Sequence, residues 1–344
     1  MRANIVFAPI ETPKVLSKPT PLAEFSQGLS RFSGFSPHAG ANGTFVHFST
    51  YSEAMRDSGA RNADRILSNV SDTARWVAAC RAWESARSDA LFSDPLAARL
   101  AGEQGKAIAN LAPRQVRNGW PMVIRTRLID DLIMACLREG CDCVVNLAAG
   151  LDTRPYRLPL PASLNWIEVD LPGIIDEKSR LLAGEKPACR LRREKVDLAD
   201  ATQRADFVGQ ATRDAKKVLT VTEGLLIYLE DDTVRSIGQD LATRQVIRWW
   251  ILDIASPAIL RMMRRGMGEH LAQAPLRFAP VEGIGFLEAL GWKALEIRSL
   301  LNEAIRLRRV PFFLRLFSLF PEPDPRNPGK MTRWSAVARL ERNG

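Results

Sequence analysis

Residues Cys143 to Asp170, CVVNLAAGLDTRPYRLPLPASLNWIEVD, decide the fold of this chain. Cys143 to Leu147 is a short apolar run interrupted only by Asn146, which is typical of a strand covered on both faces of a parallel sheet. At Gly150 the missing Cβ allows a tight turn and lets a ligand approach main-chain N–H groups. A second strand ends at Asp170, about twenty residues later, where nucleotide-binding folds carry an acid for ribose hydroxyls. Gly150 and Asp170 therefore outline a pocket for an adenosine-like ligand.

Two better-known phosphate-binding loops do not match this stretch. The dinucleotide fingerprint G-x-G-x-x-G fails because Ala148 replaces its first glycine and Thr153 its third. A P-loop fails because no G-K-[ST] follows. At this point a turn glycine with a purely backbone purpose remains the alternative.

Length and composition indicate a globular protein. The chain has 344 residues, of which 46% are hydrophobic and 25% charged, enough for one large domain or two smaller ones. No stretch approaches the roughly 20 apolar residues of a membrane-spanning helix. We therefore expect no stable membrane insertion. The net charge is +9, but the Arg and Lys residues are scattered among 39 acids and do not form one basic stripe, so we do not expect nucleic acid as a partner.

The cysteines and histidines do not predict a metal site. Five cysteines without framework spacing indicate reduced thiols and a cytoplasmic location. Cys141-x-Cys143 has no partner pair, and Cys143 falls inside the expected buried strand. The three histidines, His38, His47 and His270, lie far apart in sequence.

Strands and helices alternate along most of the chain. Residues 1–60 are rich in Ser, Pro and Gly and predict a disordered extension, and residues 61–344 predict one domain. Helical spacing appears at 71–86 and 122–138, and strands are expected at 143–147, 166–170, 190–196, 218–222, 249–254, 292–297 and 334–340. The pattern predicts an α/β fold with a doubly wound, Rossmann-like seven-stranded sheet, mostly parallel with an antiparallel last strand.

Acids follow successive strands in a common register. Asp170, Asp197 and Glu223 each stand at or just after the end of a strand, and the fifth strand ends near Asp253. Open α/β sheets bind ligands at the carboxyl ends of their strands, so Asp170, Asp197 and Glu223 are expected to share one crevice. Arg125, on the helix before the first strand, is a candidate partner for a ligand carboxylate.

Six blocks of sequence identify a family. SDTARWVAACRA, IRTRLIDDLI, VVNLAAGLDTRPYRL, WIEVDLPGIIDEK, the VDL at Val196 and TEGLLIYL occur in order over about residues 68–255. The chain thereby resembles the class I S-adenosylmethionine-dependent methyltransferases of the leucine carboxyl methyltransferase family, in particular its bacterial O-methyltransferase branch. The resemblance implies S-adenosyl-L-methionine as cofactor.

The resemblance also assigns roles near the methionine part of the cofactor. Arg125 matches the arginine that pairs with the methionine carboxylate, and Gly150 the turn glycine beneath it. Glu223 matches the acid near the amino group. Tyr228 would lie by the methyl-transfer site as an orienting donor.

Other positions match the nucleoside part. Asp170 resembles the acid that holds the ribose hydroxyls. Asp197 and Leu198 match the acid and its neighbour beside the adenine, and Asp152 with Thr153 would support the turn. Family members usually carry glycine where this chain has Ala148.

The predicted activity is methyl transfer from S-adenosylmethionine to a carboxylate or acidic hydroxyl of a small molecule. A carboxylate acceptor needs no general base, and the matched region contains no histidine. Residues 256–284 and 301–330 lie outside the strong match and are expected to be substrate-side insertions. A catalytically degenerate cofactor-binding regulatory protein and a nucleotide-dependent oxidoreductase remain alternatives. The sequence leaves the acceptor and the oligomeric state open.

Overall fold

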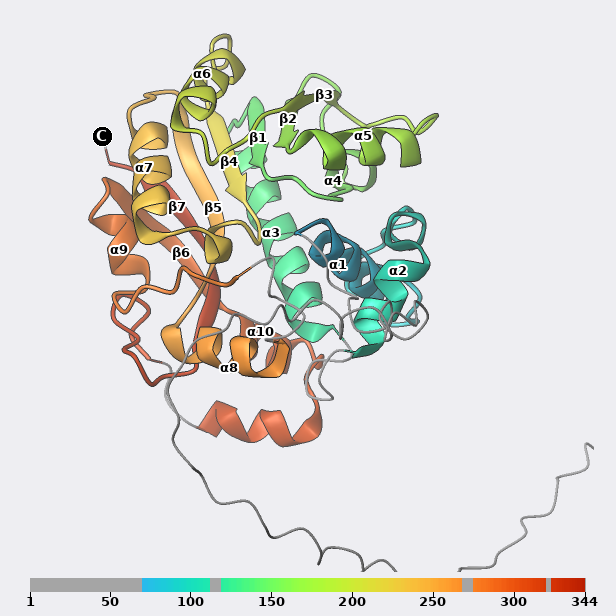
Figure 1. Cartoon of the computed structure of the whole chain (residues 1–344), viewed down its shortest axis with the longest axis vertical. Coiled ribbons are helices and arrows are strands. Elements are labelled where there is room, and N and C mark those ends of the chain that lie inside the picture. The colour runs from blue at the N-terminus through green and yellow to red at the C-terminus, as the bar shows by residue number, and fades with distance from the viewer. Residues whose placement is uncertain (1–69, 112–118, 268–274, 320–322, 344) are drawn as a thin grey trace, which may run out of the picture. The chain divides into compact units, whose positions relative to one another are not determined.

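A seven-stranded sheet forms the centre of the structure, which is a computed structural model that describes residues 70–111, 119–267, 275–319 and 323–343 (Figure 1). The predicted extension at 1–60 lies outside the described residues. The strands are β1 Cys143–Leu147, β2 Asn165–Asp170, β3 Arg190–Lys195, β4 Val218–Thr222, β5 Ile247–Ala255, β6 Trp292–Ser299 and β7 Ser335–Arg342. Their spatial order is β3-β2-β1-β4-β5-β7-β6.

All strands except β7 run in the same direction. β1 pairs in parallel with both β2 and β4, and β5 continues this parallel set beside β4. β7 is antiparallel to both of its neighbours, β5 and β6, and lies between them. The predicted fold class, mostly parallel with an antiparallel last strand, is confirmed.

Helices cover both faces of the sheet because alternate strand residues point to opposite sides. Val144 packs in the layer that contains α3 and α10, whereas Val145 packs in the layer that contains α6, α7 and α9. The α-helices are α1 Val70–Ser85, α2 Ala97–Leu111, α3 Trp120–Arg138, α4 Arg154–Arg157, α5 Pro172–Leu181, α6 Ala201–Ala211, α7 Asp231–Ala242, α8 Pro257–Met267, α9 Ile284–Glu288 and α10 Leu300–Arg306. Short 3₁₀ helices follow at η1 Leu226–Tyr228 and η2 Phe312–Leu319. No helix in these described ranges is long and apolar enough to cross a bilayer.

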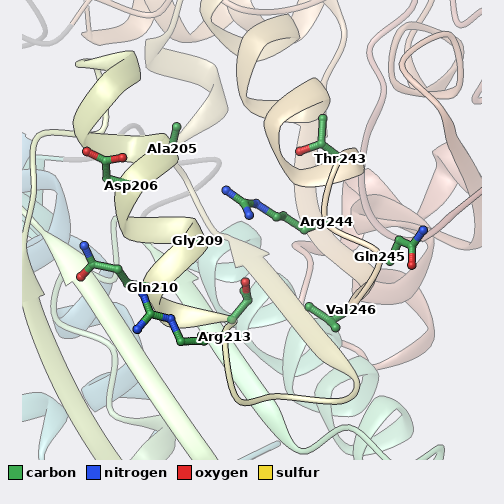
Figure 2. Close-up of a pocket in the computed structure, with 10 residues that line it drawn as sticks. Ala205, Asp206, Gly209, Gln210, Arg213, Thr243, Arg244, Gln245 and Val246 are labelled. Carbon is green, nitrogen blue, oxygen red and sulfur yellow. The ribbon is translucent and has the colours of Figure 1, made fainter.

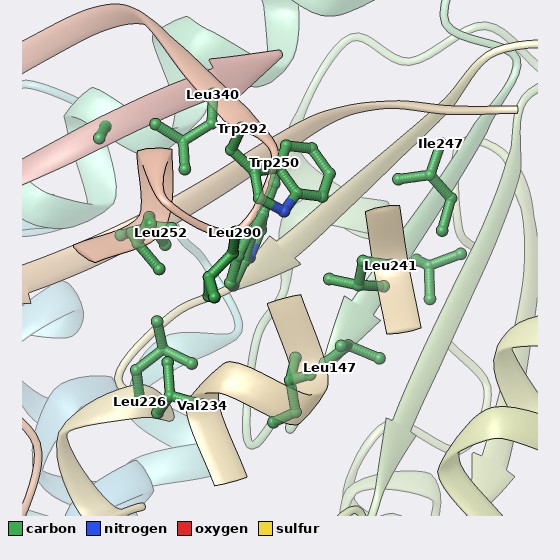
Figure 3. Close-up of a cluster of buried hydrophobic side chains, with 14 of the residues drawn as sticks. Leu147, Leu226, Val234, Leu241, Ile247, Trp250, Leu252, Leu290, Trp292 and Leu340 are labelled. Atoms are coloured by element: carbon green, nitrogen blue, oxygen red, sulfur yellow. The ribbon is translucent and has the colours of Figure 1, made fainter. Parts of the chain in front are cut away.

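Two tryptophans anchor the layer around α7 and α9 (Figure 3). The rings of Trp250 on β5 and Trp292 on β6 meet edge to face with centroids 5.3 Å apart. Each buried indole N–H has an acceptor: Trp250 donates to Thr222 Oγ1 at 2.9 Å and Trp292 to the Gly238 carbonyl at 3.0 Å. Satisfying both donors removes the usual cost of burying a polar group in the core.

Helices α1 and α2 form a separate packing unit over the turn that follows β1. Trp76, Leu100 and Ile108 make a hydrophobic cluster that includes Leu151 from this turn.

The five cysteines of the chain are all buried free thiols. The sequence pattern predicts α1 and α3 but not α10, a seven-residue helix in which the Ser299 hydroxyl accepts from Asn302 N–H. α10 and η2 fall largely within residues 301–330, and α8 falls within 256–284.

Candidate functional site

The carboxyl ends of the parallel strands bring the predicted residues to one edge of the sheet. Gly150 and Asp152 follow β1, Asp170 ends β2, Asp197 follows β3 and Glu223 follows β4. All five line one large cavity, together with Arg125, Leu198 and Tyr228. The crevice expected from the register of the strand ends is therefore present.

Asp170 fixes the glycine turn through main-chain hydrogen bonds. Its carboxylate accepts from Gly150 N–H at 2.7 Å and from Leu171 N–H at 2.7 Å. Burial raises the pKa of Asp170, and these two donors offset part of that rise. Each carboxylate oxygen keeps a second lone pair, so the side chain can still accept a hydroxyl from a ligand.

The turn itself has two left-handed positions, Ala148 and Gly150, with Ala149 between them. Gly150 has φ +47° and Ala148 has φ +54°. A Cβ at Gly150 would lie 3.4 Å from Ala74 Cβ on α1. For Ala148, the backbone conformation explains why a glycine suits this position: an L-residue with a Cβ pays a steric penalty there.

Arg125 joins two acids from different strands. It donates through Nε to Glu223 Oε1 at 3.0 Å and through Nη1 to Asp253 Oδ2 at 3.1 Å. Asp253 also accepts from Gly224 N–H at 2.6 Å, which holds the turn after β4. Burial lowers the pKa of Arg125, but Asp253 and Glu223 more than reverse this, so the guanidinium stays charged. Sequence analysis placed Asp253 at a strand end without assigning it to the site.

Arg154 is a central residue of the site that sequence analysis missed. It lies on α4, is 2% exposed, and contacts three acids: Asp130 at 2.6 Å, Asp152 at 2.9 Å and Glu223 at 2.7 Å. Burial raises the pKa of Glu223, but Arg154 and Arg125 more than offset it, so this pKa lies below its ordinary value. The pKa of Asp152 is lowered in the same way, with Arg154 as the main opposing charge.

The charges continue from Arg154 toward α1 and α2. Arg157 forms a two-pronged pair with Asp130 at 2.7 and 2.9 Å. Asp94 accepts from Arg81 at 2.8 Å, and Arg81 in turn donates to the Leu151 carbonyl at 2.7 Å. The turn after β1 is thus held by two side chains: Asp170 of β2 accepts from Gly150 N–H, and Arg81 of α1 donates to the Leu151 carbonyl. The sequence did contain a signal for this network, because Asp130 lies in the family block IRTRLIDDLI and Arg154 in the block VVNLAAGLDTRPYRL.

Tyr228 lines the same cavity, close enough to Arg125 and Asp253 for their charges to act on its hydroxyl. It belongs to η1 and packs against the small cluster of Leu260 and Leu276, as does Met263 of α8. Burial raises the pKa of its hydroxyl, and a hydrogen bond with Thr73 of α1 only partly opposes this. At neutral pH the phenol keeps its proton, so it can donate a hydrogen bond but does not act as a base.

The cavity is larger than one ligand needs. Its volume is about 1540 Å³, whereas pockets for single small ligands span about 300–1,000 Å³. A second depression, between the carboxyl ends of α6 and α7, is lined by Gly209, Arg213, Arg244 and Val246 (Figure 2). Because it lies where β4 and β5 begin, it contains none of the strand-end acids.

Comparison with known proteins shows which family the chain belongs to. Residues 74–242 match the model of the family described as leucine carboxyl methyltransferase. A protein of Frankia alni is 31% identical over 251 residues, covering 66% of this chain and 84% of its own length, and one of Mycolicibacterium smegmatis is 33% identical over 258 residues, covering 66% and 85%. The chain belongs to the leucine carboxyl methyltransferase family. Both relatives carry the name "Putative S-adenosyl-L-methionine-dependent methyltransferase".

Solved structures share the fold of this family member. A DUF574 family protein from Streptomyces avermitilis superposes with a TM-score of 0.50 at 14% identity, covering 79% of this chain and 97% of that one. At this identity the likeness concerns the fold alone. It agrees with the mostly parallel sheet and its antiparallel β7.

Proposed function

We propose that this chain transfers a methyl group from S-adenosylmethionine to a carboxylate or acidic hydroxyl of a small molecule. That it is an S-adenosylmethionine-dependent methyltransferase follows from its family membership. O-methylation of an acidic acceptor is supported by the pKa shifts of side chains that line the cavity.

The cofactor residues fit S-adenosylmethionine by charge. Around Arg125 and Arg154 the buried network holds four acids, Asp130, Asp152, Glu223 and Asp253, against three arginines, with Arg157 as the third. The network therefore carries one excess negative charge, which suits a ligand with an ammonium and a sulfonium group beside one carboxylate. Arg125 would hold that carboxylate, and Glu223 or Asp253 the ammonium.

The nucleoside part has its own acceptors along the same edge. We assign Asp170 to the ribose hydroxyls, and Asp197 with Leu198 to the adenine. Asp197 is exposed and its carboxylate accepts from Ala199 N–H at 2.9 Å, whereas Leu198 is buried and offers an apolar contact. Asp152 and Thr153 support the turn through hydrogen bonds with Arg154 and Asp94, respectively.

The single observation that carries the choice of acceptor is that three groups lining the cavity, Glu223, Asp152 and Tyr228, are poor bases. Glu223 and Asp152 have lowered pKa values because they are paired with arginines, and Tyr228 has a raised pKa because it is buried. A carboxylate acceptor is already ionised and needs only to be positioned, and positioning alone can supply on the order of 7–11 kcal/mol. Tyr228 would orient the acceptor by donating a hydrogen bond.

Calorimetry with S-adenosylmethionine and NAD in parallel tests the cofactor. Binding of NAD without S-adenosylmethionine would favour the oxidoreductase instead. Release of S-adenosylhomocysteine over a panel of small acids, phenols and amines tests the reaction. Turnover confined to amines would refute O-methylation, and binding without turnover on any acceptor would favour the regulatory, non-catalytic alternative.

A further inference from the structure

The cavity extends beyond the strands that carry the cofactor acids. β1 to β5 supply those acids, with Asp253 on β5, but the edge of the sheet continues through β7 and β6. The beginning of β7 lies beside the end of β5, with Ser335 opposite Ala255, and the end of β6 beside it, with Ser299 opposite Ala336. Cavity-lining residues from α8, from Ser299–Asn302 and from Met331–Ser335 thus form a second end, the acceptor end.

The acceptor end is apolar and contains no acid among the described residues that line it. Its large side chains include Met262 and Met263 of α8, Leu301 of α10, Leu314 of η2, Met331 and Trp334. Its charged side chains are Arg265 and Arg333, both exposed. All the acids of the cavity stand at the other end, at the strand ends from Asp152 to Asp253. An anionic ligand with an apolar body is therefore the best match to this lining.

The apolar lining continues onto the outer surface. Among the described residues six large hydrophobic side chains are exposed, and two of them, Met262 and Met331, line this end. Two more, Phe312 and Leu316, belong to η2, which also carries the lining residue Leu314. Met331 is 83% exposed and Phe312 77%. Arg261 ties α8 to this region by donating to the Lys330 carbonyl and contacting Met331 Sδ at 3.6 Å. Figure 1 shows α8 and α10 at the same end of the domain. Exposed apolar side chains gathered at a pocket mouth indicate an apolar ligand.

We propose that the methyl acceptor is an amphipathic monocarboxylic acid whose carboxylate faces Tyr228 and whose apolar chain lies between α8, α10 and Met331. The inference rests on the proposed function and specifies its substrate class. In the transfer one carboxylate oxygen forms a bond to the methyl carbon while the carbon–sulfur bond breaks. The electron pair of that bond stays on sulfur. The products are a methyl ester and S-adenosylhomocysteine, and no proton is exchanged.

Each part of the proposal has a physical reason. Each methylene group that leaves water adds to the affinity, so the long apolar lining favours long acids over short ones. Arg265 and Arg333 at the mouth attract an anion during its approach. An alkylammonium of the same length would meet the same apolar lining but with the wrong sign of charge.

Calorimetry of the full chain with saturating S-adenosylhomocysteine provides the test, with dodecanoate, butanoate and dodecylamine as probes below their micellar concentrations. We expect dodecanoate to bind at least 100-fold more tightly than butanoate and at least tenfold more tightly than dodecylamine. Mass spectrometry of the turnover mixture with S-adenosylmethionine should show methyl dodecanoate equal in amount to S-adenosylhomocysteine. Equal affinities for the long and the short acid, or for the acid and the amine, overturn the proposal.

Single substitutions locate the binding end. Met262→Glu and Met331→Glu should each weaken dodecanoate binding at least tenfold while leaving the affinity for S-adenosylhomocysteine unchanged. Leu295→Glu is the matched control, because Leu295 is a 39% exposed hydrophobic residue of β6 outside the cavity. If both methionine variants bind dodecanoate like the control, the acceptor end is wrong. If S-adenosylhomocysteine fails to bind the unmodified protein, the proposed function itself fails, which is a separable result.

Discussion

At the scale of single residues, the conformation of the turn after β1 limits which side chains it tolerates. Ala148 and Gly150 both have positive φ, and a Cβ is penalised at each position. The sequence showed only that Ala148 departs from a glycine pattern; its left-handed backbone is a property of the folded turn. Asp170 matters for the turn for a different reason, since its carboxylate accepts hydrogen bonds from two main-chain N–H groups.

Replacing either Gly150 or Asp170 should weaken cofactor binding. Gly150→Val places a β-branched side chain at φ +47° against Ala74, and Asp170→Ala removes the acceptor of Gly150 N–H. We expect each change to weaken S-adenosylmethionine binding at least tenfold, about 1.4 kcal/mol, in titration calorimetry. Asp176→Ala, an exposed acid of α5, should leave the affinity unchanged. Unchanged affinity in both site variants would refute the pocket assignment.

Substitutions at Ala148 should rank by their tolerance of positive φ. Ala148→Val should lower the free energy of unfolding by about 1–3 kcal/mol, because a β-branched residue is strongly disfavoured in the left-handed region. Ala148→Gly relieves the same strain and should be at least as stable as the unmodified protein, despite the added flexibility of glycine when unfolded. Urea denaturation measures the free energy of unfolding of both variants. An equal loss of this free energy in the two would show that packing, not backbone strain, governs this position.

At the scale of elements, the strands were easier to predict than the contacts between them. The short run of β1, apolar except for Asn146, is decided by local sequence, and the structure has the predicted bounds Cys143–Leu147. The burial of Arg154 could not be predicted locally, because arginine is seldom buried unless paired. Its partners come from α3 and from the end of β4, Asp130 and Glu223, which are brought together only by the fold.

The contact between β5 and β6 side chains through Trp250 and Trp292 should dominate the stability of that part of the sheet. Trp292→Ala removes a fully buried ring and should cost about 3–5 kcal/mol of unfolding free energy. Leu295→Ala on the same strand is the control, since its side chain is 39% exposed and should cost less than about 1 kcal/mol. Chemical denaturation measures the unfolding free energy of both variants, and the comparison holds if their m-values are unchanged. A loss for Trp292→Ala as small as for the control would mean that the core relaxes around the gap.

At the scale of the whole molecule, the buried charge network connects the turn after β1 with α1, α2, α3 and β4. Such pairs are costly to break, because removing one partner leaves the other charge buried and uncompensated. The network also links folding to pH. Glu223 and Asp152 have folded pKa values below their ordinary values of 4.5 and 3.8, so the unfolded chain binds more protons in acid.

Stability should therefore be fully present near neutral pH and decline as pH falls below about 4.5. Arg154→Met should cost about 3–5 kcal/mol at pH 7, because three acids lose their shared partner. The loss should shrink toward pH 4 as those acids become protonated. Arg99→Met, which breaks an exposed pair with Glu185, should cost less than about 1 kcal/mol at either pH. Urea unfolding at the two pH values measures both variants, and a pH-independent loss for Arg154→Met would contradict the electrostatic account.

The position of β7 between β5 and β6 also has a consequence for synthesis on the ribosome. β7 follows β6 in the chain, so β6 cannot join the sheet until β7 has emerged. Ser335 comes 36 positions after Ser299, which corresponds to roughly 2–7 s of translation at 5–20 residues per second. During that interval the nascent chain presents the unpaired edge of β5, including Trp250 and Leu252, beside an undocked β6. An open apolar edge of this kind is the substrate that cellular chaperones bind, so the yield of folded enzyme in a cell depends on protection during those seconds.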